Sequence, residues 1–363
     1  MTDTKNVSGV ERSLLIIALF LIICIAIKMT AYIFNLLIIS CILALLALPV
    51  LNMLKRRGMS HGAAVAVVTA AAALCLLVLI LLTMYSFNVL MADLPLYQAE
   101  FNQRVSDITS LLDYWGISAG SFFPTSLDFR SLAGMVMSSA LSSGDTLLYV
   151  FFIAVTTLFL LLEAPHITAR IEKLLVNEPE KLRQMAGMSR YVIDFMIVRT
   201  ETNLVHGLLF GGILSLMGVH AAMLWGILTF ILGYIPYLGL VIAAVPAIFF
   251  ANLQFGVWGA FAVVAVVCVL NLLVENPVFS YLASRRFEIP AIIVILSVIF
   301  WGWLLGLPGM LFSVPITLMV LILIQGSDEL RWVNVLLGVS HLFEDGMNHG
   351  AKNPDKETGS ETG

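Results

Sequence analysis

The sequence predicts an all-α polytopic membrane protein with about eight hydrophobic segments, of which one or two are broken, re-entrant helical hairpins. Of its 363 residues, 60% are hydrophobic and 12% are charged, which is roughly half the charged share of soluble domains. The mean hydropathy is +1.00. Apolar runs recur from residue 14 to residue 325, and the alternation expected of a membrane β-barrel is absent from the sequence.

Two apolar runs, residues 14–27 and 30–51, are separated only by Lys28 and Met29. The side chain of Lys28 can reach the membrane interface, so we expect the two runs to form a tight helical hairpin. No small-residue cleavage site precedes Lys28, which predicts a retained span and not a removed signal peptide. The basic residues 55–57 and a third run, Gly62 to Leu90, follow.

The section after the third run, residues 91–145, is acidic and is predicted to lie outside the cytoplasm. It carries six acidic residues against Arg104 and Arg130. Apolar side chains recur in it every three or four residues, as on one face of an amphipathic helix that ends at Gly116. These side chains are Leu94, Tyr97, Phe101, Val105, Ile108, Leu112 and Trp115.

The section from residue 166 to residue 202 is basic and predicts cytoplasmic amphipathic helices. Basic residues accumulate on the cytoplasmic side of membrane proteins. Residues 55–57 and 166–202 therefore predict one side, the acidic section predicts the other, and both chain termini are expected in the cytoplasm.

The next run, residues 203–219, carries Gly207 and Gly211 at a spacing that lets two helices approach closely. A polar cluster stands at its start, where such side chains are ordinary helix caps, and we favour capping over a solute-binding role. The cluster comprises Thr200, Glu201, Thr202, Asn203 and His206.

The apolar runs 221–232 and 240–251 are both shorter than the roughly 20 residues that a membrane-spanning helix needs. Between them, Pro236 removes an amide donor and Gly239 admits unusual backbone angles, so the helix breaks and leaves free peptide groups. Such groups persist at membrane depth only where protein or a water-filled cavity receives them. We therefore predict a re-entrant hairpin with a functional tip, which alanine at both positions would close.

A second broken unit covers residues 289–325, with Gly306-Leu-Pro308-Gly309 at its middle. In both units the tip is followed by Val-Pro, at Val245-Pro246 and at Val314-Pro315. Matching interruptions in two halves of a membrane protein indicate the binding site of a secondary transporter. The alternative is that the second unit is two ordinary spans joined by a Gly-Pro turn.

Glu275 is the one acidic residue deep in a later apolar run, and Asn271 lies one helical turn before it on the same face. An ionisable residue in a membrane segment is costly unless it is paired or hydrated, so Glu275 predicts a proton or cation site. The alternative is an interfacial carboxylate paired with Arg285 or Arg286.

Four sequence blocks stand out around the two breaks: Tyr234-Ile-Pro236-Tyr237-Leu-Gly239, Ala243-Ala-Val-Pro246, Phe300-Trp-Gly-Trp-Leu-Leu-Gly306 and Gly309-Met-Leu-Phe-Ser-Val-Pro315. These blocks resemble those of the autoinducer-2 exporter family of bacterial inner-membrane proteins. Asn271, Glu275 and Asn276 match a polar cluster of that family, although Ser280 stands where the family usually has proline.

The resemblance implies export of the small polar autoinducer-2 signal of quorum sensing across the inner membrane. Other members of the family are described as sodium or lithium ion/proton antiporters. The resemblance also implies self-association, with a pentamer as one candidate. The candidate binding residues from the two breaks are Tyr234, Pro236, Tyr237, Gly239, Gly306, Pro308 and Gly309.

The sequence thus predicts one transmembrane transport domain over residues 1–343 and a disordered polar tail over residues 344–363. It contains no catalytic constellation, phosphate-binding loop or metal-ligand motif, so we expect no enzyme activity, cofactor, metal or nucleic acid partner. The expected partners are a small polar solute, Na⁺ or H⁺, membrane lipid and copies of the same chain. A non-transporting membrane scaffold is the rival hypothesis, but a scaffold has no need of two helix breaks.

Overall fold

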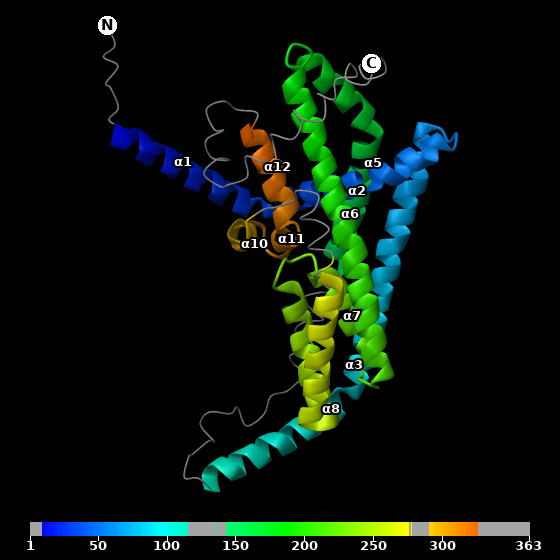
Figure 1. Cartoon of the computed structure of the whole chain (residues 1–363), viewed down its shortest axis with the longest axis vertical. Coiled ribbons are helices and arrows are strands. Elements are labelled where there is room, and N and C mark those ends of the chain that lie inside the picture. The colour runs from blue at the N-terminus through cyan, green and yellow to red at the C-terminus, as the bar shows by residue number, and fades with distance from the viewer. Residues whose placement is uncertain (1–8, 115–133, 135–142, 276, 278–289, 326–363) are drawn as a thin grey trace, which may run out of the picture.

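The computed structural model describes residues 9–114, 134, 143–275, 277 and 290–325. Every regular element in these ranges is a helix (Figure 1). Four helical stretches are long and apolar enough to cross a membrane, namely Ala31–Arg56, His61–Pro95, Leu148–Leu174 and Gly239–Glu275. These stretches confirm the predicted all-α polytopic class.

The expected tight hairpin of the first two apolar runs is wrong. Helices α1 (Gly9–Met29) and α2 (Ala31–Arg56) leave their junction in different directions (Figure 1). Instead of packing along α2, α1 buries Cys24 in an apolar cluster with residues of the later helix α10 (Ala291–Leu305). Lys28 also belongs to this contact, because its ammonium lies 4.5 Å from the centre of the Trp303 ring.

Helix α3 (His61–Tyr114) contains both the third apolar run and the described part of the amphipathic section, and Pro95 lies inside it. Leu94 and Tyr97 are buried in the main core, which confirms the apolar face predicted there. Trp115 and Gly116 lie outside the described residues. Helix α5 (Ser143–Leu174) contributes Leu161 to a separate apolar cluster with residues of α2 and α3.

Helix α6 (Pro179–Leu216) joins the second half of the basic section to the span that follows it. The helix continues without interruption through residue 202. The second half of the basic section packs against neighbouring helices, and its residues Val192 and Met196 are buried. Further along α6, a Cβ atom placed on Gly207 would lie 2.6 Å from the carbonyl oxygen of Gly226 on the next helix. The close helix approach predicted from the small residues is therefore present.

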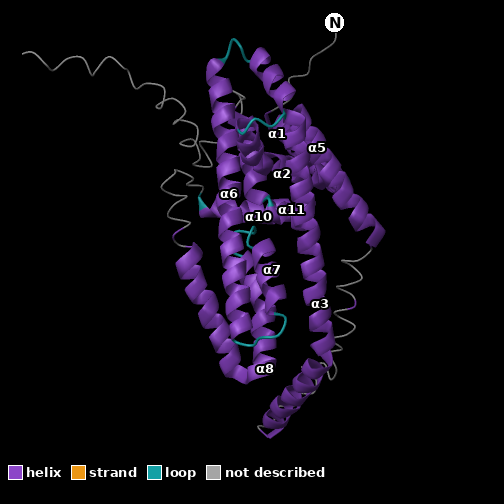
Figure 2. Ribbon diagram, turned by 90° about the vertical axis from the view of Figure 1, so that its right-hand side faces the viewer, coloured by secondary structure: helices purple, strands orange, loops and turns teal. Residues whose placement is uncertain are grey.

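Helices α7 (Ala222–Leu232) and α8 (Gly239–Leu270) form the first broken unit. Gly256 interrupts α8 with a φ of 71°, and the helix folds back there (Figure 2). A Cβ atom on Gly259 would lie 2.5 Å from the carbonyl oxygen of Ala251, so the two halves of α8 touch beside this turn. The helix ends in a π-helical turn, Asn271–Glu275.

The second broken unit comprises α10, the single-turn helix α11 (Leu307–Leu311) and α12 (Ser313–Gln325). Gly306 breaks the helix with a φ of 73°. The tips of the two units meet in the middle of the molecule (Figure 1), where Ile235 is buried in a cluster with residues of α10 and α11.

The residues with opposite predicted membrane sides lie at opposite ends of the molecule. The α2–α3 and α5–α6 connections are at one end, and the far end of α3 and the α6–α7 turn are at the other (Figure 1). This separation agrees with the charge pattern, while the assignment of either end to the cytoplasm stays a prediction. The polar tail, residues 344–363, lies outside the described residues.

Candidate functional site at the first helix break

Three polar residues of α6 face the first break: Arg199, Asn203 and His206 stand at the i, i+4 and i+7 positions of one helix face. The capping interpretation of this cluster is wrong, because the helix begins at Pro179. The hydroxyl of Thr200 donates to the carbonyl of Met196 at 2.6 Å, a bond within the helix interior. These side chains therefore do not cap the start of α6.

Arg199 fastens the break to the rest of the bundle. Its Nη1 donates to Oε1 of Glu275 at 2.6 Å, in an ion pair whose side chains are 11% and 30% exposed. Its Nε donates to the carbonyl oxygen of Gly233 at 2.9 Å, and its Nη2 donates to the same oxygen. One guanidinium thus joins α6, a carbonyl freed by the helix break and the carboxylate at the end of α8.

Two glycines allow the tip to reach this position. A Cβ atom on Gly233 would lie 2.6 Å from Oδ1 of Asn203, and one on Gly239 would lie 1.8 Å from the carbonyl oxygen of Leu232. Both distances are far below an ordinary van der Waals contact, so any larger residue would force the backbone apart. Gly239 is therefore needed for close packing at the first position of α8, more than for an unusual dihedral angle.

Tyr234 connects the tip to α6 and to the second broken unit. Its hydroxyl lies 2.7 Å from the hydroxyl of Thr200, a hydrogen-bond distance. Its ring lies 6.3 Å from the ring of Phe312, measured between centroids, at the junction of α11 and α12. The side chain of Tyr234, a predicted site residue, therefore contacts both α6 and the second broken unit.

Several buried polar atoms beside the ion pair have no hydrogen-bond partner among the described residues. They are Nδ2 of Asn203, Nε2 of His206 and Oγ1 of Thr229. Buried polar groups are normally satisfied, and exceptions call for an explanation such as an ion, water or functional role. His206 also lies within electrostatic reach of both Glu275 and Arg199. Unpaired polar atoms are therefore present on α6 and α7, the two helices beside the tip.

Glu275 belongs to this site, and Asn271 does not share its surroundings. The two residues are the first and the last of the π-helical turn Asn271–Glu275. Asn271 is exposed, whereas Glu275 is half-buried against Arg199. Asn276 lies outside the described residues, as do Arg285 and Arg286, the alternative partners proposed for Glu275.

The remaining predicted residues of the first tip are less enclosed. Pro236 is half-buried, and its carbonyl accepts a hydrogen bond from the amide of Leu238 at 2.7 Å. Tyr237 is 49% exposed and has a φ of 62°, a left-handed conformation that is uncommon for residues other than glycine. The tip is therefore an ordered, strained turn and not an extension of either helix.

The second break has a different set of polar contacts. The side-chain amide of Asn35 on α2 donates to the carbonyl of Leu305 at 3.0 Å, and Nε1 of Trp301 donates to Oγ1 of Thr317 at 2.9 Å. Gly306 is exposed, Pro308 is half-buried, and Gly309 is buried with its Cα against the carbonyl of Trp301. No charged side chain is among these contacts of the described residues.

Sequence analysis missed Arg199, which it counted only as one positive charge of a basic section. Its partner is 76 residues away in the sequence. A signal was nevertheless present, because Arg199 shares the i, i+4, i+7 spacing with Asn203 and His206, a polar face on a helix that is otherwise becoming apolar. Among the described residues there is no group of three or more His, Cys, Asp or Glu side chains that could hold a metal ion.

An all-α bundle with several membrane-length helices and a charged pair at a broken hairpin defines a polytopic membrane transport protein. The sequence pattern of the AI-2E family transporters matches residues 14–327. The chain belongs to this family, which confirms the family resemblance, and its relatives are transport proteins and not enzymes.

Three relatives illustrate the similarity. The AI-2 transport protein TqsA of Escherichia coli is 26% identical over 92% of this chain and 96% of its own length. A protein of Haemophilus influenzae is 28% identical over 92% of this chain and 98% of its own length. YhhT of Escherichia coli is 27% identical over 83% of this chain and 87% of its own length. The last two are named only as a "Putative transport protein".

Proposed function

We propose that this protein is a secondary transporter that exports a small hydrophilic molecule, the autoinducer-2 signal, across the bacterial inner membrane. The observation that carries the proposal is the Arg199–Glu275 pair, which fastens the tip of a broken hairpin inside the helical bundle. The name of TqsA as an AI-2 transport protein supports the choice of solute. A polyhydroxylated solute needs hydrogen-bond partners, and Asn203, His206 and Thr229 offer unpaired polar atoms beside the tip.

In the proposed mechanism the ion pair holds the tip of the first broken unit against α6. While Glu275 is ionised, it holds the guanidinium of Arg199 in place, and Arg199 in turn holds the Gly233 carbonyl. Neutralisation of Glu275 weakens this hold, because the guanidinium loses its charged partner. The Gly233–Leu238 segment then moves relative to α6 and opens the solute site to one side of the membrane, as alternating access requires.

A sodium or lithium ion/proton antiporter is the second candidate function. It is favoured by the half-buried carboxylate of Glu275 with His206 nearby, since carboxylate and histidine chains carry protons and cations in membrane transporters. In that case Na⁺ or Li⁺ replaces Arg199 as the partner of Glu275. A non-transporting scaffold would give Arg199 and Glu275 a structural role alone.

Proteoliposomes with imposed gradients separate these functions. Purified protein is reconstituted, and efflux of autoinducer-2, Na⁺ flux and H⁺ flux are measured in parallel with wild type, Glu275→Gln and Arg170→Gln. Arg170 is a matched control, because it also pairs with a glutamate but lies 72% exposed on α5. Autoinducer-2 efflux that is lost only in Glu275→Gln supports the exporter. Cation-for-proton exchange without efflux establishes the antiporter, and no flux of any kind in the wild type supports the scaffold.

The proposed location is the inner membrane with both termini in the cytoplasm. Cysteine scanning tests it in a background without the native cysteines. A cysteine near Arg104 should react with an impermeant reagent in intact spheroplasts, and one near Lys181 should react only after permeabilisation. The opposite pattern would reverse the orientation without affecting the proposed site.

A further inference from the structure

A pocket with a volume of about 680 Å³ lies between the end of α2 and the first half of α6, away from the helix breaks. Its lining has two kinds of residue. Three arginines, Arg56, Arg57 and Arg190, supply positive charge, and Asp194 supplies one negative charge. Leu48, Pro49, Met53 and Ile193 form an apolar part of the wall.

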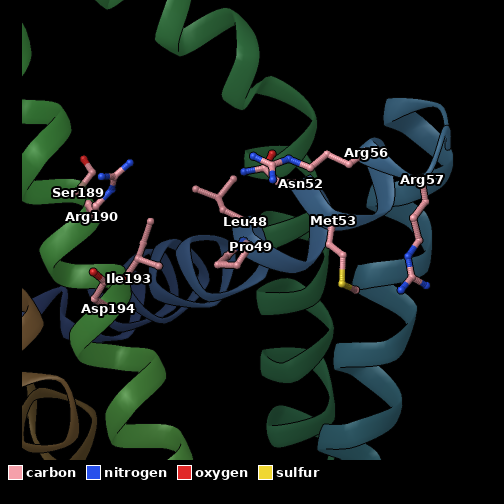
Figure 3. Close-up of a pocket in the computed structure, with 10 residues that line it drawn as sticks. All are labelled: Leu48, Pro49, Asn52, Met53, Arg56, Arg57, Ser189, Arg190, Ile193 and Asp194. Carbon is pink, nitrogen blue, oxygen red and sulfur yellow. The ribbon is translucent and has the colours of Figure 1, made fainter. Parts of the chain in front are cut away.

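The three arginines that line the pocket point in different directions. Figure 3 shows Arg56 extending from α2 toward α6, where Arg190 stands on the facing helix, while Arg57 turns toward α3. Asn52 adds a neutral side chain that can donate a hydrogen bond close to Arg56 (Figure 3). Guanidinium groups on both walls of the pocket, with the side-chain amide of Asn52 beside Arg56, form an arrangement suited to a phosphate group, whose oxygens accept several hydrogen bonds.

The position of the pocket indicates where this phosphate comes from. The apolar helix Ala31–Arg56 is long enough to span a membrane, and the pocket lies at its basic end. Lipid phosphates lie at the ends of membrane-spanning segments, and the apolar part of the pocket wall can receive the glycerol and acyl portion of a lipid. A soluble phosphate compound has no part that would use Leu48, Pro49 and Ile193.

We propose that this pocket binds one membrane phospholipid, with its phosphate between Arg56 and Arg190 and its upper acyl chain along the apolar wall. The bound lipid bridges α2 and α6 and so fixes the helix that carries Arg199. The proposal rests on a membrane location, and it does not depend on the identity of the transported solute. Asp194 lies one helical turn beyond Arg190 and limits the affinity through its negative charge.

Native mass spectrometry of the detergent-purified full chain, titrated with phosphatidylglycerol, tests the proposal. The double variant Arg56→Gln/Arg190→Gln should bind phosphatidylglycerol roughly tenfold more weakly than the wild type, because two partners of the phosphate are removed. Asp194→Asn should bind it more tightly, and Arg170→Gln should match the wild type. Opposite signs for the arginine and aspartate changes distinguish phosphate binding from a general loss of structure. Equal lipid binding by the wild type and the double variant would overturn the proposal.

Two further measurements use the wild-type protein, so they do not depend on how the variants fold. A phospholipid with a photoreactive group near its phosphate should label peptides that contain Asn52 or Ile193, and labelling confined to other helices refutes the site. Glycerol 3-phosphate, added at the concentration of the lipid, should not displace it. Displacement would assign the pocket to a soluble phosphate compound and overturn the lipid assignment.

Discussion

The two helix breaks have similar sequences and different surroundings. At the first break a guanidinium binds the freed carbonyl of Gly233 and is itself held by the carboxylate of Glu275. At the second break the corresponding carbonyl, that of Leu305, accepts a bond from the neutral amide of Asn35. Proline and glycine therefore determine that the helix breaks. Residues from other helices determine whether a charged or a neutral group binds the freed carbonyl.

This difference assigns the two units separate roles. An ion pair between partly buried groups depends on protonation and on competing cations, whereas a neutral amide–carbonyl bond does not. In the proposed mechanism the first unit is thus the part that responds to charge, and the second is the surface against which it moves. The contact of Ile235 with the cluster that contains Val298, Met310 and Leu311 is where the two meet.

The largest expected effect comes from Arg199→Gln. Removing one partner leaves the Glu275 carboxylate without its cation, which costs about 3 kcal/mol of folding stability, the lower end of the range for buried pairs, because Glu275 is 30% exposed. Transport should fall by at least roughly tenfold, because a loss of about 1.4 kcal/mol in holding the tip already shifts the equilibrium between its held and released positions by that factor. Thermal unfolding and proteoliposome efflux measure the two quantities.

The double variant Arg199→Gln/Glu275→Gln sharpens this test. With both charges removed, neither group is left ionised and unpaired, so stability should recover relative to Arg199→Gln while transport stays low. If the double variant is as unstable as the sum of the two single variants, the residues are not coupled and the comparison between the breaks loses its basis.

Gly239→Ala should have the next largest effect. Its added methyl group would meet the Leu232 carbonyl, so the tip must open and stability should fall by about 1–3 kcal/mol. The expectation that alanine at both Pro236 and Gly239 closes the break into a continuous helix stays a prediction, since the close contact at Gly239 describes the broken form alone. Pro236→Ala alone is the control and should be much milder, because Pro236 is half-buried. Equal melting temperatures for the two variants would contradict the close packing at Gly239.

The sequence was sufficient for the parts of the structure that local chemistry controls. The positions of both breaks followed from Pro236, Gly239, Gly306 and Pro308, because these residues limit helix continuity whatever their neighbours are. The apolar face of α3 around Leu94 and Tyr97 followed from helical periodicity.

The parts that depend on distant contacts could not be predicted in this way. The divergence of α1 and α2 follows from the packing of Cys24 against α10, which no local pattern reveals. The polar cluster after Arg199 looked like a helix start because the continuity of α6 through a basic section depends on buried neighbours such as Val192. The Arg199–Glu275 pair required the fold itself, since Arg199 belongs to the basic section and Glu275 to an apolar run 76 residues later.

Tyr234→Phe should have a moderate effect. It removes the hydroxyl that lies 2.7 Å from the Thr200 hydroxyl, while Thr200 keeps its bond to the Met196 carbonyl. The cost should be about 1 kcal/mol, as for one hydrogen bond, with a matching loss of transport because the tip is less firmly joined to α6. Tyr237→Phe, on the exposed side of the same tip, is the control. Efflux that is equally reduced in both variants would show that the Thr200 contact is irrelevant.

The smallest expected effect is that of Asn35→Leu at the second break. The substitution removes the amide that binds the Leu305 carbonyl at 3.0 Å, and it also removes Oδ1 of Asn35, which is buried without a partner among the described residues. The lost hydrogen bond and the relieved oxygen oppose each other, so the net change in stability should stay within about 1 kcal/mol. Transport at matched protein level should remain near that of the wild type, because the Leu305 carbonyl is bound by a neutral amide and not by an ion pair. A loss of transport as large as that of Arg199→Gln, with stability unchanged, would show that the second break also moves during the transport cycle.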